Sequence, residues 1–241
     1  MNDSSGGELP SLASQIGRVA APLRAQVYDV LKEAILTMRF APGQRLIERE
    51  LIEMTGVSRT TIREVLRELA AEGFVRTIPQ KGAVVVALSA EEAEELYEIR
   101  EVLEAHLVRR FVAHASDAQV VAVRRAFTQL EDAVEQGLGT MDILRAKDRV
   151  YEVLLEGAGN SALRASLSQL HVRVSLMRAG SLSSDPGRPA QSVRELRRLV
   201  EAIEAREADE AAEAVIAHVR AAARLGIAAV GSREKVPADR G

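Results

Sequence analysis

A short segment around residue 60 combines arginine and threonine side chains at helical spacing. Arg59, Arg63 and Arg67 recur every four residues, so on a helix they form one cationic row, and Thr60 and Thr61 stand beside its first member. An arginine guanidinium can donate two hydrogen bonds to O6 and N7 of guanine, and a threonine can contact a phosphate or a thymine methyl group. These residue types at this spacing are typical of a helix that reads bases in the major groove of DNA.

An acidic row next to the arginines supports an alternative interpretation. Glu64, Glu68 and Glu72 are also four residues apart, so they could pair with the arginines on an ordinary solvent-exposed helix. The charge pattern by itself favours neither interpretation. The elements on either side of the segment must therefore decide between them.

The residues before the cationic row predict a helix and a tight turn. The helix begins near Glu48, turns Leu51 and Ile52 inward, and ends at Gly56, which can adopt the positive φ of a sharp reversal. After Val57, which fills the corner, Ser58 is a suitable N-cap for the second helix. The apolar side of that second helix carries Ile62, Val65, Leu66 and Leu69.

The residues after the row predict a β-hairpin. Gly73 closes the helix, Val75 to Ile78 and Ala83 to Ala87 read as strands, and Pro79 to Gly82 reads as the turn between them. Lys81 and Gly82 would stand at the hairpin tip, where lysine can meet a phosphate and glycine lets the backbone approach a sugar closely. The hairpin is a wing, and it favours DNA reading over the solvent-exposed alternative.

The segment from about Leu23 to Leu88 resembles the winged helix-turn-helix of GntR-type bacterial transcription regulators. The resemblance rests on a leading helix with Val27, Leu31 and Ile35, followed by the run FAPGQRLIERELIEMTGVSRTTIREVLRELAAEGFVRTIPQKGAVV. Residues 79 to 83 suit the longer wing tip of one sub-branch. The resemblance implies that DNA is contacted at the positions used by FadR-type members, here Arg49, Arg59, Thr60, Thr61, Arg63 and Gly82.

Composition predicts a mainly α protein of two domains. The chain has 241 residues, of which 47% are hydrophobic and 3% aromatic, and it contains no cysteine, so disulfides and thiolate metal sites are excluded. We expect a flexible tail over 1–20, the winged helix-turn-helix over 21–88, an all-helical domain over 89–230 and a second flexible tail over 231–241. Neither a signal peptide nor an apolar run of about 20 residues is apparent, which predicts a cytoplasmic, nucleoid-associated protein without membrane contact.

Charge is divided unevenly along the chain. The formal net charge is −3, from 32 Lys and Arg against 35 Asp and Glu. Through Ala87 there are 11 basic and 10 acidic residues, a balance of +1, which leaves 21 and 25, a balance of −4, for the remainder. Because the first part is only weakly basic, we expect DNA binding to use a local arginine face, presented twice by a homodimer.

The second part of the chain reads as a bundle of about six helices. Ser89 with Glu92 and Ser116 with Gln119 both have the spacing of a capping box. Glycine, asparagine and proline separate the helices, and such a bundle can enclose a small-molecule site. The predicted helices span residues 90–114, 117–136, 140–156, 160–179, 189–206 and 208–229.

This helical region, roughly Ala90 to Ala229, resembles the FCD effector-binding domain of the FadR subfamily. The motifs are EIREVLEAHLVRRFVAHAS from Glu98 to Ser116 and, further along, DRVYEVLLEGAGN. The resemblance implies a helical barrel around a small carboxylate ligand, frequently beside a divalent metal held by one Asp and three His. It makes an effector-binding role the expectation for this domain.

Two of the four implied metal ligands are changed. Asp148 and His218 fit ligand positions, whereas Glu152 and Leu196 stand where histidines are expected. Asp148 and Glu152 lie one helical turn apart, so with His218 they could form an oxygen-rich site that favours a hard cation over zinc. The alternative is a polar patch in the core, in which Asp148 and His218 form an ion pair or a hydrogen bond.

The resemblance also assigns Arg100 to the effector pocket, where its guanidinium would bind a ligand carboxylate with two hydrogen bonds. The alternative is a salt bridge from Arg100 to Glu104, one turn along the helix. His171 is more often packed than recruited as a ligand in such a position, and His106 and His114 suit a solvated or interface role.

The sequence therefore predicts a ligand-responsive transcriptional regulator that binds a palindromic operator as a homodimer and represses transcription. The alternative is a constitutive DNA-binding regulator whose effector pocket has degenerated and holds no metal. Catalysis is not expected, because the chain contains neither a G-x-S-x-G elbow, nor a phosphate-binding glycine loop, nor an H-E-x-x-H motif.

Overall fold

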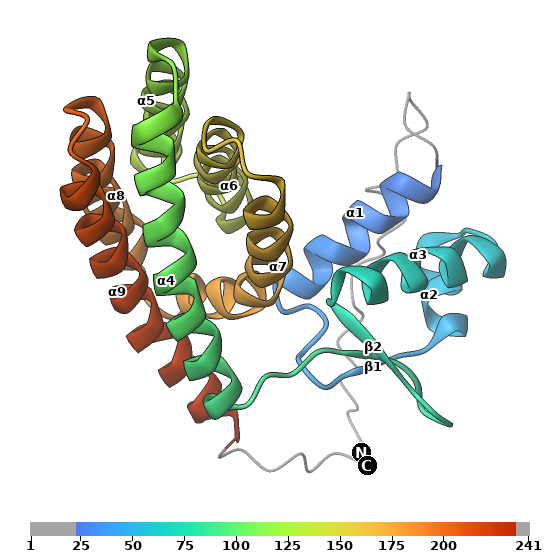
Figure 1. Ribbon diagram of the computed structural model, residues 1–241. Helices are drawn as coiled ribbons and strands as arrows, with labels where there is room; N and C mark the ends of the chain where they lie inside the picture. The colour runs from blue at the N-terminus through green and yellow to red at the C-terminus, as the bar shows by residue number, and fades with distance from the viewer. Residues whose placement is uncertain (1–22, 235–241) are drawn as a thin grey trace. The chain divides into compact units, whose positions relative to one another are not determined.

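The chain folds into two compact units in the computed structural model, which describes residues 23–234 except for the side chains of 178–184 and 232–234 (Figure 1). One unit contains residues 23–35 and 39–86, and the other contains residues 36–38 and 87–234. The tail expected over 1–20 lies outside the described residues, as do residues 235–241. Residues 231–234 continue the last helix, so the expected start of the second tail was wrong.

The first unit is a small helical domain with a three-stranded antiparallel sheet. Its sheet has the strand order β1-β3-β2, so β3 is central. Val27, Leu31, Leu51, Ile62 and Leu69 are almost completely buried and form the interior between the helices. The elements in chain order are α1 (Leu23–Leu36), β1 (Arg45–Leu46), α2 (Glu48–Thr55), α3 (Arg59–Glu72), β2 (Val75–Ile78) and β3 (Gly82–Val85).

The turn between α2 and α3 has the predicted geometry. Gly56 adopts φ of 71°, in the left-handed region, and Val57 is buried beside it. The Ser58 hydroxyl accepts a hydrogen bond from the Thr61 amide at 3.2 Å, so it caps one of the amides that lack a partner at the helix start. These two contacts fix the direction in which α3 leaves the turn.

The wing differs in detail from the predicted hairpin. Ile78 pairs with Gly82, so the connecting turn contains residues 79–81, and the return strand begins at Gly82 and ends at Val85. Gln80 and Gly82 both have positive φ, at 65° and 79°. The sequence analysis missed β1, whose two residues pair with the free side of β3, because so short a strand leaves no alternating pattern.

The second unit contains all six predicted helices. Both capping boxes form: the Ser89 and Ser116 side chains accept from backbone amides of Glu92 and Gln119, whose side chains accept from the cap amides in return. The loop between the fourth and fifth of these helices is shorter than expected, because the fourth helix continues beyond residue 179. The helices are α4 (Ala90–His114), α5 (Asp117–Glu135), α6 (Thr140–Gly157), α7 (Ser161–Ser184), α8 (Arg188–Glu204) and α9 (Ala208–Glu234).

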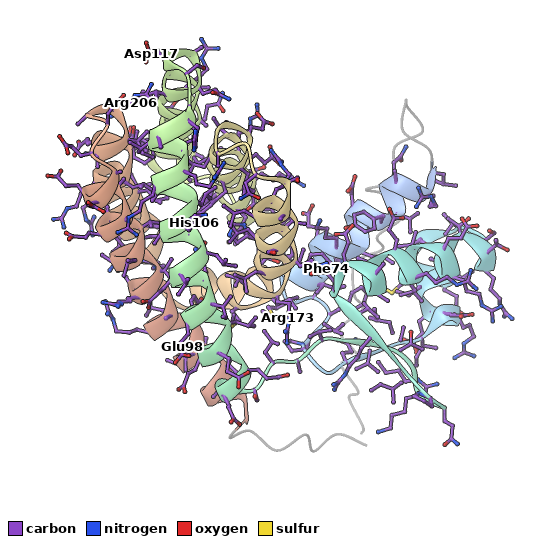
Figure 2. The ribbon with its side chains drawn as sticks, in the orientation of Figure 1. Phe74, Glu98, His106, Asp117, Arg173 and Arg206 are labelled. Atoms are coloured by element: carbon purple, nitrogen blue, oxygen red, sulfur yellow. The ribbon has the colours of Figure 1, made fainter. Side chains whose placement is uncertain are left out.

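The six helices pack around one apolar core, in which α4 and α9 lie side by side and α6 and α7 approach α4 from its other side (Figure 1). Arg206, in the α8–α9 connection, joins one end of this bundle together (Figure 2). Its guanidinium donates to the Ala115 carbonyl and to the Asp117 carboxylate, both at 2.7 Å, so the ends of α4 and α8 are tied to the start of α5.

Helix α9 is long and apolar enough to span a membrane by composition alone, since residues Ala208–Gly231 contain a window with a mean hydropathy of 1.4. The apolar composition has another explanation here. Ala211, Val215 and Val219 are fully buried against the other helices, which is typical of the core helix of a bundle.

Candidate functional site

The cationic row of α3 lies on the exposed side of that helix. Arg59 and Arg67 are exposed and form no ion pair within the described residues, and Thr60 is exposed between them. Thr61 is half-buried because its amide and hydroxyl contact Ser58. Two guanidinium groups and a hydroxyl are thus available to a ligand along α3.

The acidic row of the same helix is used in packing against α1. The Glu68 carboxylate pairs with Arg24, and the Glu72 carboxylate lies 3.4 Å from the Lys32 ammonium group. Burial, together with the neighbouring Glu72, raises the pKa of the Tyr28 hydroxyl well above its usual range. Glu68 and Glu72 therefore have partners on another helix, and the alternative in which the whole acidic row neutralises the arginine row does not describe α3.

Arg63 differs from its two neighbours in the row because it has a protein partner. Its Nε atom donates to both carboxylate oxygens of Glu48, at 2.9 and 3.0 Å, and this links the start of α2 to α3. Arg49 is 78% exposed in its side chain and lies 3.8 Å from Glu53. The pair of Glu48 and Arg63 holds the guanidinium at the surface, where more than half of the Arg63 side chain is still accessible.

The two residues predicted at the tip of the wing lie there. Lys81 and Gly82 are both exposed at the tip of the β2–β3 hairpin. A lysine at such a tip presents a mobile charge that suits a phosphate better than a base edge. The first unit therefore presents two cationic elements, the row on α3 and the tip of the wing.

In the helical unit, Arg100 lies at the centre of a buried network that we call the Arg100 network. Its Nε donates to Glu104 Oε1 at 2.5 Å, and both side chains are completely buried. The Tyr151 hydroxyl donates to the other Glu104 oxygen at 2.8 Å, and His171 Nε2 contacts Glu104 Oε1 at 3.0 Å. The salt bridge considered for Arg100 thus forms, and His171, expected only to be packed, also bonds to a carboxylate.

Electrostatics keep this network charged. Burial alone would raise the pKa of the Glu104 carboxyl, but the Arg100 charge and the His171 hydrogen bond outweigh it and hold the pKa below its usual range. Burial alone would lower the pKa of Arg100, and the Glu104 charge reverses this. The Nη1 atom of Arg100 nevertheless has no hydrogen-bond partner among the described residues.

The structure does not assemble the proposed metal set of Asp148, Glu152 and His218. Asp148 and Glu152 lie on the exposed side of α6, where Glu152 pairs with Arg149 at 2.9 Å, whereas His218 is completely buried. The side chains that the structure describes include no group of three His, Asp or Glu residues placed to hold a metal ion. Leu196 is fully buried as an apolar core residue.

Buried His218 instead contacts Lys147, which precedes Asp148 by one residue. Lys147 Nζ lies 2.9 Å from His218 Nε2 and donates to the Ser192 hydroxyl at 3.1 Å. On its other side, His218 Nδ1 lies 2.6 Å from a Glu195 oxygen, and Arg188 donates to the second Glu195 oxygen at 2.8 Å. We call these five residues the Lys147 cluster.

Sequence reasoning missed Lys147 and Tyr151 because it chose the polar residues of α6 by their match to a motif. The helical period was the better guide. Ile143, Leu144, Val150 and Leu154 mark the buried stripe of α6 by their i, i+3, i+4 spacing, and Lys147 and Tyr151 fall on that stripe. Asp148 and Glu152 are each one residue, or about 100°, further around the helix. Ser192, Glu195 and Arg188 carried no comparable signal, and His106 and His114 are exposed as expected.

Comparison with known proteins places both units in described families. The FCD domain matches residues 95–221, more than half of the chain, and the bacterial regulatory proteins of the gntR family match residues 23–85. The HTH-type regulator YdhC of Bacillus subtilis is 28% identical over 68% of this chain and 73% of its own length. A regulator from Agrobacterium vitis is 33% identical over 59% of this chain and 81% of its own length.

Solved structures show the same fold. Escherichia coli McbR/YncC superimposes with a TM-score of 0.70 at 20% identity, covering 90% of this chain and all of that one. A GntR regulator from Rhodococcus sp. RHA1 gives a TM-score of 0.68 at 22% identity, covering 84% of this chain and 96% of that one. The chain therefore belongs to the GntR family of bacterial DNA-binding transcriptional regulators, with an FCD domain behind its winged helix-turn-helix.

Proposed function

We propose that this regulator is a repressor that binds a palindromic operator as a homodimer and is controlled by a small carboxylate effector in its helical domain. The observation that carries the DNA-reading part is the row on α3, where Arg59 and Arg67 are exposed without an ion pair in the described chain while Glu68 and Glu72 pair with α1. In this proposal Arg59, Thr60 and Arg63 contact base edges, and Thr61 and Arg49 contact the phosphate backbone.

The Glu48–Arg63 pair supports a base-reading role for Arg63. Only the Nε atom of Arg63 is used in the pair, which leaves its Nη1 and Nη2 atoms without a partner in the described part of the chain. A guanidinium held on one side and open on the other is preorganised for bidentate hydrogen bonding to guanine. Lys81 and Gly82 at the wing tip then hold the neighbouring phosphates and sugar.

The charge of the first unit supports a dimer. The balance of +1 through Ala87 is small for a DNA-binding region, so two copies acting together supply the affinity that one copy lacks. A two-fold symmetric dimer would read a palindrome with half-sites separated by about one helical turn of DNA. Relatives that are named repressors, RspR of Escherichia coli at 26% identity and the histidine utilization repressor of Pseudomonas aeruginosa at 31%, support repression as the direction of control.

The proposal is tested by selecting bound fragments from genomic DNA and measuring affinity for the resulting operator by gel shift. We expect Arg59→Ala and Arg63→Ala each to weaken binding by about 1–3 kcal/mol and to relax the sequence preference at one position. Lys81→Ala should weaken binding to all DNA sequences alike. It should also reduce the dependence of affinity on salt concentration by the contribution of about one phosphate contact. Arg109→Ala is the control, because Arg109 is exposed on the helical unit and pairs with Asp209. Unchanged operator affinity in both α3 variants would contradict the proposed reading helix.

A constitutive regulator is the second candidate, and a specific observation favours it: the described side chains include no group of three His, Asp or Glu residues placed to hold a metal ion. The two candidates differ in whether effector binding and operator binding are thermodynamically coupled. An effector that binds two dimer geometries unequally must change operator affinity, and operator DNA must change effector affinity by the same factor. Operator titrations with and without small carboxylic acids separate them, since a constitutive regulator gives the same affinity in every titration.

A further inference from the structure

Two exposed arginines lie on one face of the small sheet in the first unit. Arg45 in β1 and Arg76 in β2, the two outer strands (Figure 1), both pair with Val84 of the central strand β3, so the three side chains point to the same face. Because neighbouring strands lie about 4.8 Å apart, the two arginine backbones are about 10 Å from each other across β3. Val84 is only 5% exposed, so the two guanidinium groups form the surface here. We call Arg45 and Arg76 the wing-sheet pair.

The wing-sheet pair has no counter-charge among the described residues. Neither guanidinium forms an ion pair there, and Ile78 and Gly82, which share this face of the hairpin, carry no charge. Acidic residues of the same unit pair with cations outside the sheet, and these pairs are Glu48 with Arg63, Glu53 with Arg49, Glu68 with Arg24 and Glu72 with Lys32. The balance of only +1 through Ala87 therefore conceals a local excess of positive charge on the sheet.

The wing-sheet pair is close to the tip of the wing. Arg76 precedes Ile78, the last residue of β2, by two residues, and Lys81 is exposed in the turn that follows. With a rise of about 3.3 Å per residue, Arg76 lies about 7 Å along the strand from the start of the turn. Phosphates recur about every 3.4 Å along the axis on each strand of DNA, so a backbone that meets Lys81 carries further phosphates toward Arg76. Arg45 continues the same cationic surface across the sheet.

We propose that the wing-sheet pair is a second phosphate-binding site, which holds the DNA backbone beside the half-site that α3 reads. The inference rests on the DNA-reading part of the proposed function and adds two residues that this part does not use. A guanidinium binds a phosphate with two parallel hydrogen bonds and keeps its charge at physiological pH. Two such groups on strands about 10 Å apart suit a repeated anion, the DNA backbone, better than a single small anion. Contacts of this kind add affinity and fix the register of the protein on DNA, but they carry no base preference.

The dependence of operator affinity on salt concentration tests this site. The full chain is compared by gel shift with the double variant Arg45→Gln with Arg76→Gln, between about 50 and 200 mM salt. Each phosphate contact contributes about 0.9 to the slope of log affinity against log salt, so the slope of the double variant should be smaller by about two for each bound copy. The loss of affinity should be largest at the lowest salt concentration. The ratio of operator affinity to random-sequence affinity should not change, because phosphates are common to all sequences.

Matched variants separate this site from a general loss of positive charge. Arg109→Gln with Arg197→Gln also removes two exposed cations, but from the helical unit, and should leave the slope unchanged. Arg45→Lys with Arg76→Lys keeps both charges and should retain the slope of the wild type. The single variant Arg76→Gln should lower the slope by about one for each bound copy, and it takes the place of the double variant if that one does not fold.

Two results would overturn the proposal: an unchanged salt slope in the glutamine variants, or a changed base preference. Glutamine variants that bind the operator like the wild type but no longer repress transcription in a purified system would assign the pair to an acidic protein partner instead. The proposed function is tested separately by Arg59→Ala and Arg63→Ala. If these two variants weaken binding and the glutamine variants do not, only the second phosphate site is contradicted. If the two α3 variants bind normally, the reading helix is contradicted whatever the wing-sheet pair does.

Discussion

Replacing Glu104 by glutamine removes the one negative charge that compensates Arg100 in the core of the helical unit. The carboxylate accepts from Arg100 Nε at 2.5 Å, from the Tyr151 hydroxyl at 2.8 Å and from His171 Nε2 at 3.0 Å. A glutamine of the same shape offers one oxygen instead of two, and its amide group turns a donor toward a donor. The variant therefore leaves the Arg100 cation buried without a counter-charge.

The expected loss follows from that burial. Both side chains have no solvent exposure, so solvent screening does not reduce the effect, and breaking such a pair on one side costs about 3–5 kcal/mol. A domain of this size has a total stability of about 5–15 kcal/mol. Glu104→Gln should therefore remove about a fifth or more of the stability of the helical unit while leaving the first unit folded.

Urea unfolding followed by far-ultraviolet circular dichroism measures this loss. Glu152→Gln is the control, since Glu152 also pairs with an arginine one turn away but is exposed to solvent, and it should cost less than about 0.5 kcal/mol. The double variant Arg100→Met with Glu104→Leu should cost clearly less than Glu104→Gln, because it removes both charges together. If Glu104→Gln unfolds at the same urea concentration as Glu152→Gln, the buried charge pair does not stabilise the fold and the reasoning is wrong.

The remaining predictions concern acid, packing and capping. Because the pKa of Glu104 is held below its usual range, the stabilisation from its charge is complete above the unfolded pKa of about 4.3 and is lost as pH falls from there. Wild type should therefore lose more stability in acid than Glu104→Gln. Urea midpoints compared across pH measure this difference. Gly157→Ala should cost about 1–3 kcal/mol in the same urea assay, because a Cβ there would overlap the Phe111 ring, whereas Gly139→Ala, which meets no close atom, serves as the control. Ser58→Ala should cost about 1 kcal/mol of first-unit stability by thermal unfolding and weaken operator binding, and Ser58→Asn, another good N-cap, should restore both; an unaffected Ser58→Ala variant would contradict the capping role.

Local signals predicted most of the fold. Glycines at the turn and at the end of α3, serines at the caps, and the apolar period of each helix are properties of a few neighbouring residues, so the winged unit and six further helices could be placed in advance. The strand β1 could not, because its two residues form a strand only by pairing with β3, which is 37 or more residues away in sequence. The true end of α7, at Ser184, was also missed, because the helix was predicted to end before Gly180 and it continues through that glycine.

The candidate sites were predictable to different degrees. The α3 row depends on one helix, so its spacing alone identified Arg59 and Arg63 as neighbours. The partners that decide its charge are Arg24, Lys32 and Glu48, and these come from other elements through contacts that no local pattern encodes.

The sequence by itself determined most elements of this protein, the arginine row of α3 and the family, because each of these depends on residues close together along the chain. Only the tertiary structure decided which polar residues lie inside the helical unit. Lys147 is buried and Asp148 is exposed, because successive residues lie about 100° apart around a helix. The α6 side chain that lies buried beside His218 is therefore Lys147, and not the carboxylate expected for a metal site. Packing against α8 and α9 fixes the rotation of α6 about its own axis. Burying its stripe of apolar residues lowers the free energy of the folded state, whereas burying its acidic residues would not.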